Sequence, residues 1–113
     1  KKWVAQCAEL MGGIDVVINN ASHPGMAPFE AMDVETWNYG IRNELDLVYN
    51  VCNCAWPYLK EGNGANIIIT SSTVGLQGSN SPQACHAAAK AHAWHLLASS
   101  PLKAVLSEFA AIP

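Results

Sequence analysis

The sequence has little charge, and only 13% of its 113 residues are Asp, Glu, Lys or Arg. With a net charge of −3, it lacks the basic surface that nucleic acids and anionic membranes attract. Long hydrophobic runs are also missing, because no apolar stretch approaches the roughly 20 residues that cross a bilayer. The sequence begins Lys1-Lys2-Trp3-Val4 without a long apolar continuation, so no secretory signal is expected. We therefore predict a protein without nucleic-acid or membrane partners.

The sequence has four cysteines, and their spacing does not predict disulfides. Cys52 and Cys54 fall in a helical pattern, where residues two apart point in different directions. Reduced thiols of this kind are typical of a cytoplasmic protein, which is the location we predict. A metal site is an alternative role for four Cys and His residues, although their spacing fits no strong zinc pattern. These residues are Cys85, His86, His92 and His95.

Half of the residues are hydrophobic, which predicts one folded domain rather than a disordered chain. Apolar residues at helical spacing predict a helix over residues 2–11, which Gly12 and Gly13 would end. Residues 14–19 are a short, nearly all-apolar run, which is typical of a parallel strand that is covered on both faces of a sheet. Residues 65–70 are predicted to form the second parallel strand.

A long helix is predicted between these two strands, over residues 34–59. Asp33 would cap its N-terminus, and Pro57 should kink or end its last turns. Apolar residues recur every three or four positions and predict one core-facing stripe along this helix. The stripe consists of Trp37, Ile41, Leu45, Val48, Cys52, Ala55 and Leu59.

Polar residues follow the second predicted strand at the end where ligands bind in parallel α/β sheets. Ile67–Thr70 is followed at once by Ser71 and Ser72. His86 and Lys90 are four residues apart in the next segment and would share one face of a helix. A hydroxyl, an imidazole and an ammonium that converge at this end would form a site for proton transfer.

Three stretches together resemble the short-chain dehydrogenase/reductase family, which are Rossmann-type oxidoreductases that use NAD or NADP. Gly13–Ser22 is similar to the family's strand ending in N-N-A-G, and Ile68–Gly75 to the strand that delivers the catalytic serine. His86–Lys90 takes the place of the Y-x-x-x-K element, with His in place of Tyr. The resemblance implies an α/β fold with a partial, doubly wound parallel sheet in the order helix-strand-helix-strand-helix. Residues 1–113 would form a partial NAD(P)-binding Rossmann-like domain, the central fragment of a longer protein.

The resemblance also implies catalytic roles for four residues. Ser72 matches the family's Ser-x-x-Gly step better than Ser71 and would hold the substrate oxygen. His86 would be the acid/base, and an imidazole, which titrates near 6.5, needs less activation at neutral pH than a phenol near 10. Lys90 would contact the nicotinamide ribose. Glu44 falls where the family has a catalytic Asn, and its carboxylate would hold a water or pair with Lys90, unless it is simply a polar helix residue.

The implied cofactor is NAD or NADP. The residues expected to line it are Asn20, Ala21, Ser22, Thr70 and Lys90. An ordinary polar loop is the alternative interpretation of residues 19–25, which are rich in Asn, Pro and Gly. The family's Gly-rich phosphate-binding turn has no counterpart in the sequence. Intact relatives would act on a small alcohol or ketone, and a homo-oligomer is expected.

Other hypotheses follow from the tail, which departs from the family's pattern from about residue 91. Pro101 should interrupt the helix, and no further strand is predicted after it. With freely chosen codons, the neighbouring reading frame of the tail can encode the segment that the family usually has there. This would make the chain a truncated, frameshifted and non-catalytic fragment. A further alternative is an oligomeric interaction module that uses exposed helices.

Overall fold

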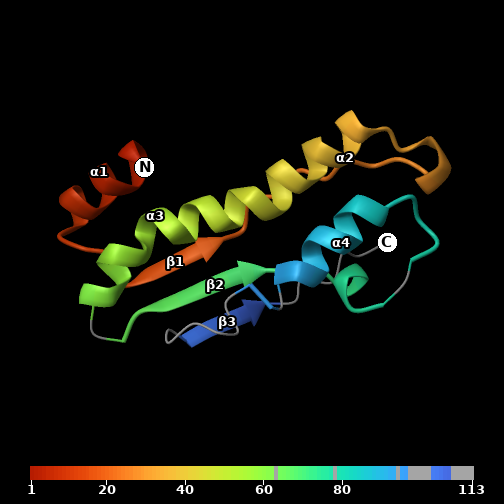
Figure 1. Cartoon of the computed structure of the whole chain (residues 1–113). Coiled ribbons are helices and arrows are strands. Elements are labelled where there is room, and N and C mark those ends of the chain that lie inside the picture. Colours follow the sequence, from red (N-terminus) through yellow and green to blue (C-terminus); the bar gives the residue numbers. More distant parts are fainter. Residues whose placement is uncertain (63, 78, 94, 97–102, 108–113) are drawn as a thin grey trace.

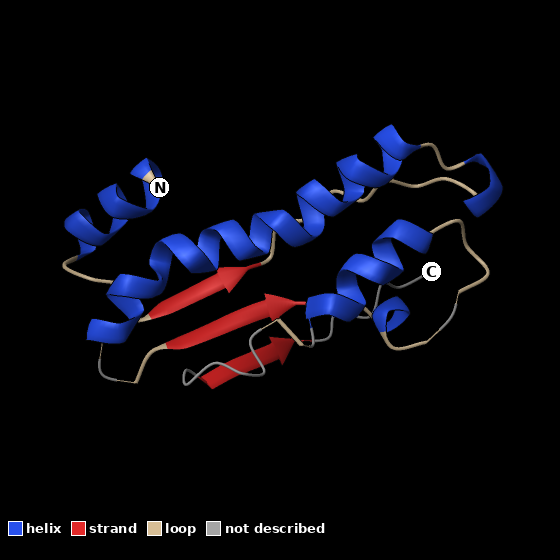
Figure 2. Cartoon of the chain, in the orientation of Figure 1, coloured by secondary structure: helices blue, strands red, loops and turns tan. Residues whose placement is uncertain are grey.

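The structure is a computed structural model that describes residues 1–62, 64–77, 79–93, 95–96 and the backbone of 103–107. Helices and parallel strands alternate along the chain (Figures 1 and 2). The helices are α1 (Lys2–Met11), α2 (Val34–Ile41), α3 (Leu47–Glu61) and α4 (Ala84–Ala93). The strands are β1 (Val16–Asn19), β2 (Asn66–Thr70) and β3 (Lys103–Ser107). Shorter turns are η1 (Phe29–Ala31), the π-helical turn η2 (Arg42–Asp46) and η3 (Thr73–Gly75).

The strands form one parallel sheet in the order β1-β2-β3, and all three point toward α4 (Figure 1). This arrangement confirms the predicted partial Rossmann-type α/β fold. The prediction that no strand follows Pro101 is wrong, because β3 pairs along its whole length with β2. The run Lys103–Ser107 is short and weakly patterned, so its strand conformation depends on the edge of β2 that it pairs with.

Only one face of the sheet is covered by the helices that the structure describes. Val17 and Ile67 pair across the sheet and are buried in one core with residues of α1 and α3. On the opposite face, Val16 and Ile18 remain 49% and 65% exposed. The prediction that β1 is covered on both faces is therefore wrong for the described residues. Among the described helices, none is long and apolar enough to cross a membrane.

The long helix is present, but it contains a widened turn. Asp33 caps α2 as predicted, since its carboxylate accepts a 2.7 Å hydrogen bond from the Thr36 N–H. In η2, the N–H of Leu47 bonds to the carbonyl of Arg42, five residues earlier instead of the usual four. The helical run then continues through the exposed Pro57 to Glu61, so the option that Pro57 ends it is wrong.

The widened turn changes which residues of the helical run are buried. Beyond it, the predicted core positions are confirmed: Val48, Cys52, Ala55 and Leu59 are buried against the sheet. Before and within it, the prediction is wrong, because Trp37 is exposed and Leu45 is only half-buried. The buried positions there are Gly40 and Glu44. A regular α-helical repeat cannot predict this shift, because the extra residue lies within the turn itself.

Candidate active site

The candidate site lies where β1 and β2 end and α4 begins. Gly75 allows the chain after β2 to approach α4 closely, because a Cβ at this position would lie 2.7 Å from Ala91 N and Lys90 C. Ser71 strengthens this contact by donating a 3.0 Å hydrogen bond to the Lys90 carbonyl. The Ser-x-x-Gly spacing therefore places the end of β2 directly against the helix that carries His86 and Lys90.

Two glycines bring the loop after β1 against the helical run. A Cβ at Gly40 would lie 2.9 Å from the backbone nitrogen of Gly25 and would also collide with the Cys85 sulfur. The Cys85 thiol donates a 3.3 Å hydrogen bond to the Trp37 carbonyl, which ties α4 to α2. Burial, followed by the nearby charge of Glu44, raises the pKa of the Cys85 thiol, so this cysteine is held as a neutral packing group.

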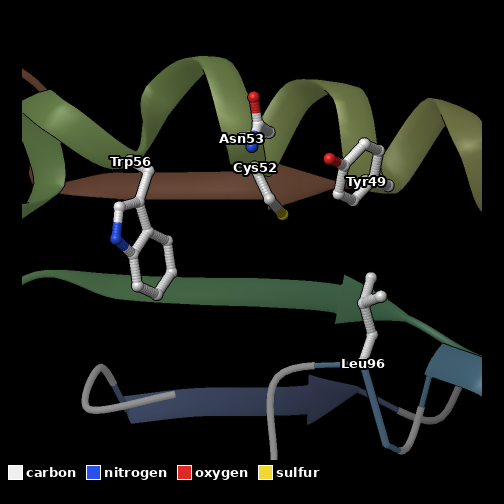
Figure 3. A pocket seen from close by; sticks show the side chains of 5 residues that line it. All are labelled: Tyr49, Cys52, Asn53, Trp56 and Leu96. Atoms are coloured by element: carbon white, nitrogen blue, oxygen red, sulfur yellow. The ribbon is translucent and has the colours of Figure 1, made fainter. Parts of the chain in front are cut away.

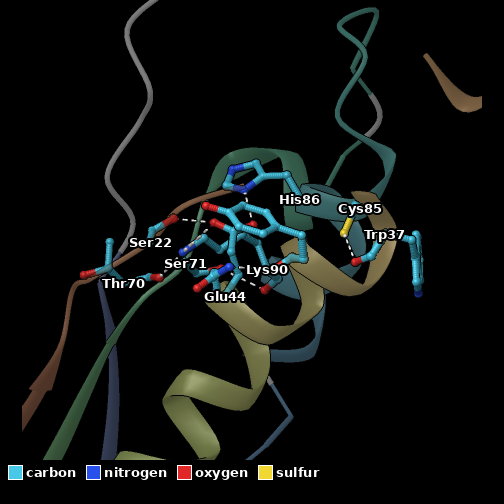
Figure 4. Close-up of polar contacts among 10 residues, drawn as sticks. Ser22, Trp37, Glu44, Thr70, Ser71, Cys85, His86 and Lys90 are labelled. Atoms are coloured by element: carbon cyan, nitrogen blue, oxygen red, sulfur yellow. Dashed lines mark hydrogen bonds and ion pairs between the residues drawn. The ribbon is translucent and has the colours of Figure 1, made fainter. Parts of the chain in front are cut away.

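Glu44 is the centre of the polar contacts at this site (Figure 4). Its side chain is fully buried, and its Oε2 lies 2.6 Å from His86 Nδ1. Ser22 donates its hydroxyl proton to Oε1, and the Lys90 ammonium lies 3.8 Å from the same oxygen. The widened turn η2 thus places one carboxylate among a hydroxyl, an imidazole and an ammonium.

Burial and neighbouring charges act in opposite directions on Glu44. Burial by itself raises the pKa of the carboxyl, but hydrogen bonds from His86 and Ser22 and the charges of His86 and Lys90 outweigh it. The pKa of Glu44 therefore lies below its ordinary value, and the group is a carboxylate at neutral pH. Burial lowers the pKa of Lys90, while the negative charge of Glu44 partly opposes that shift.

Lys90 retains hydrogen-bonding capacity for a ligand. Its ammonium donates a 3.1 Å hydrogen bond to the Thr70 carbonyl, and its side chain is only 7% exposed. An ammonium has three N–H donors, and within the described part of the chain this carbonyl is its one hydrogen-bond acceptor. Thr70 also donates its hydroxyl to the Asn20 side-chain oxygen at 2.8 Å, which joins the ends of β1 and β2.

The structure brings most of the predicted site residues into direct contact. Glu44, His86, Lys90 and Ser22 form the cluster described above, and Ala21 lies exposed in the same loop as Ser22. Ser72 is buried where β2 gives way to η3, in extended backbone. The catalytic and cofactor-binding roles of all these residues remain predictions.

Glu44 forms hydrogen bonds with Ser22 and with His86 that the sequence does not predict. From the sequence, Glu44 is expected to pair with Lys90 or to hold a water, and Ser22 is expected only to contact the cofactor. The spacing of four residues from Gly40 to Glu44 to Val48 is a signal that these positions share one face, and it is too short to interpret alone.

Two other candidate sites among the described residues are a cavity beside α3 and a metal site. A cavity of about 270 Å³ lies beside α3 and is lined by Tyr49, Cys52, Asn53, Trp56 and Leu96 (Figure 3). Burial raises the pKa of the Cys52 thiol, which leaves the lining without a charged group at neutral pH. Among the described residues, no three His, Cys, Asp or Glu side chains are grouped closely enough to hold a metal ion.

Comparison with known proteins identifies relatives of this chain by sequence. A family model described as short chain dehydrogenase matches residues 1–104. The peroxisomal multifunctional enzyme type 2 of Mus musculus is 36% identical over 90 residues, which are 80% of this chain and 12% of that protein. The 3-oxoacyl-(acyl-carrier-protein) reductase FabG of Chlamydia trachomatis is 44% identical over 79 residues, which are 69% of this chain and 31% of that protein. The chain therefore spans less than a third of the length of these relatives.

Solved structures show the same fold. A short chain dehydrogenase from Mycobacterium smegmatis superposes with a TM-score of 0.81 at 26% identity, covering 96% of this chain and 48% of that one. A short chain dehydrogenase from Burkholderia cenocepacia, solved in complex with NADP, has a TM-score of 0.73 at 23% identity. That match covers 80% of this chain and 36% of the other, and it establishes similarity of fold.

Proposed function

The chain belongs to the short-chain dehydrogenase family, and from this premise we propose that it carries the proton-transfer site of an oxidoreductase that uses NAD or NADP. The reaction would interconvert a small alcohol and the corresponding carbonyl compound. One observation carries the proposal: Glu44, His86 and Lys90 meet in a largely buried cluster at the carboxyl ends of β1 and β2. Parallel α/β sheets bind their ligands at this end.

Each residue of the cluster has a distinct part in the proposed reaction. In carbonyl reduction, the substrate carbon would receive a hydride from the reduced nicotinamide, and the substrate oxygen would receive a proton from His86. Alcohol oxidation would run the same steps in reverse, with neutral His86 taking the hydroxyl proton. Ser72 would hold the substrate oxygen, and Lys90 would bind the ribose next to the nicotinamide.

The residues present fit one end of a nicotinamide cofactor. Lys90 is buried with unused N–H donors among the described residues, which suits it to bind ribose hydroxyls. Thr70, Asn20 and Ala21 lie at the adjacent strand ends, where they would line the same part of the cofactor. The sequence contains no Gly-x-Gly-x-x-Gly turn for the pyrophosphate. The fit is therefore to the nicotinamide-ribose end alone.

The test is a titration of NADH and NADPH against the purified chain, followed by nicotinamide fluorescence and by the melting temperature. We expect binding tighter than millimolar and a raised melting temperature. Lys90→Met should weaken binding, whereas Lys60→Met, which removes an exposed lysine of α3, should not. Absence of binding by the wild-type chain, with no shift in melting, would overturn the proposal.

We also propose that the chain self-associates and resides in the cytoplasm. Its helical run exposes large apolar side chains at Val34, Tyr39 and Tyr49, which a second copy would cover. All four cysteines are free, in keeping with a reducing compartment. Light scattering after size-exclusion chromatography tests the first point, since a monomeric mass at micromolar concentration would contradict it. Localisation of a tagged protein in cells tests the second.

A further inference from the structure

Three departures from the family's motifs meet at one carboxylate. Ser22 stands where the N-N-A-G motif has Gly, Glu44 where the family has Asn, and His86 where it has Tyr. Ser22 and His86 lie 22 and 42 residues from Glu44 in the sequence, yet both form hydrogen bonds with it. We propose that these residues act as one unit in which Glu44 holds His86 in its Nδ1–H tautomer. His86 Nε2 is then the atom that exchanges a proton with the substrate. The role in proton exchange rests on the function proposed above.

The tautomer follows from the hydrogen-bonding chemistry of Glu44. An ionised carboxylate only accepts hydrogen bonds, and the pKa of Glu44 keeps it ionised at neutral pH. The atom 2.6 Å from its Oε2, His86 Nδ1, must therefore carry a proton. A neutral imidazole has a single N–H, so Nε2 is left with a lone pair. When His86 gains a second proton, that proton sits on Nε2 and is the one available for transfer.

Ser22 fixes the orientation of the carboxylate. The Lys90 ammonium lies 3.8 Å from Oε1, which is too far for a direct hydrogen bond. The Ser22 hydroxyl donates to that oxygen instead, which leaves Oε2 directed at His86. A fully buried carboxylate needs such partners, because an unpaired buried charge is strongly destabilising. Ser22 and Glu44 are thus positioning residues, and His86 is the catalytic residue.

Nitrogen NMR of the histidine rings tests this arrangement without any cofactor. The ¹⁵N-labelled chain should show the neutral form of His86 in the Nδ1–H tautomer, with its signals assigned by their loss in His86→Gln. In Glu44→Gln, whose amide can accept or donate, the Nε2–H tautomer should become populated. Ser22→Gly should raise the population of the Nε2–H tautomer by a smaller amount. Ser22→Thr keeps the hydroxyl and should give the same spectrum as the wild-type chain. An Nε2–H tautomer in the wild-type chain, or a tautomer unaffected by Glu44→Gln and Ser22→Gly, would overturn the proposal.

A second measurement asks whether the three departures depend on one another. Ser22→Gly, Glu44→Asn and His86→Tyr each restore one residue of the family's pattern, and each alone should lower stability by disrupting the cluster. The triple variant should lose less stability than the sum of the singles, since residues of one network are not additive. Additive losses in denaturant unfolding would show that the three residues are independent. Ser22→Gly remains informative if a Glu44 variant does not fold.

These results separate the two proposals. If the wild-type chain does not bind NADH or NADPH, the proposed oxidoreductase function is overturned, whichever tautomer His86 adopts. Normal binding with the wrong tautomer overturns the role of Glu44 alone. Where turnover is measurable, Glu44→Gln should lower kcat by roughly 10²-fold with little change in KM, the scale of acid–base catalysis. An unchanged kcat in that variant would show that His86 needs no orienting carboxylate.

Discussion

The two halves of the helical run from Val34 to Glu61 bury different kinds of residue. The α3 half buries an apolar stripe that includes Val48 and Leu59 against the sheet. The half formed by α2 and η2 instead buries Gly40 and Glu44. These two residues pack against α4 and against the loop that follows β1. One half stabilises the fold by removing apolar surface from water. The other holds a charge that is stable only because side chains from distant parts of the chain surround it.

Truncation in the apolar half should have the largest effect on stability. Leu59 is fully buried, and Leu59→Ala should lower the free energy of unfolding by about 2–5 kcal/mol through lost burial and the cavity left behind. Denaturant unfolding of the two proteins measures this difference. Leu10→Ala removes an 87% exposed side chain of α1 and should change stability by less than about 0.5 kcal/mol. Equal losses in both variants would contradict the assignment of the core.

A methyl group added in the other half should also destabilise, but by overpacking. Gly→Ala in a helix is ordinarily stabilising, yet a Cβ at Gly40 would meet the Gly25 nitrogen and the Cys85 sulfur. Gly40→Ala should therefore cost about 1–3 kcal/mol in unfolding free energy. Adding Cys85→Ala should recover part of the loss, because it removes one of the two colliding groups. A stabilised Gly40→Ala variant would show that this contact is looser than described.

The two halves should also differ in their response to acid. Because the pKa of Glu44 is lower in the folded chain than in the unfolded one, its contribution to stability is present above the unfolded pKa, near 4.3. That contribution is lost as the pH falls through the folded pKa. Glu44→Gln should flatten this part of the curve of unfolding free energy against pH. Leu59→Ala should lower the curve without changing its acid slope, and a similar slope in wild type and Glu44→Gln would count against the role of Glu44.

Removal of the cap that begins the run should have the smallest effect. The Thr36 backbone N–H bonds to the Asp33 carboxylate, which lowers the pKa of that carboxyl and satisfies one free donor of the first turn. Asp33→Ala should reduce the melting temperature less than either core variant, and Asp33→Asn should retain most of the stability. A larger loss from Asp33→Ala than from Gly40→Ala would reverse the order proposed here.

The sequence predicted what depends on local pattern. The α1 helix, the β1 and β2 strands and the cap at Asp33 follow from residue type and spacing, and the structure confirms them. The position of His86 and Lys90 on one face of α4 follows in the same way, because both reach Glu44. The fold class needed no more than these elements in their order.

The rest depends on tertiary contacts that spacing does not encode. The β3 strand forms because β2 offers it an edge, and the open face at Val16 and Ile18 depends on which helices pack nearby. The burial of Glu44 depends on η2, whose extra residue shifts the stripe of the first half. Its hydrogen bond from Ser22 joins two segments that no local pattern relates.

The widened turn η2 amounts to one surplus residue in an otherwise regular α-helix. Successive residues of an α-helix are rotated by about 100° around the helix axis. If the same residues returned to the usual hydrogen-bond spacing with none removed, all of α2 would therefore swing by roughly that angle relative to α3. The loop that Gly25 and Gly40 hold together would be pulled apart, although no side chain of the cluster had been altered. The length of this turn, down to a single residue, is thus as much a part of the site as the side chains it presents.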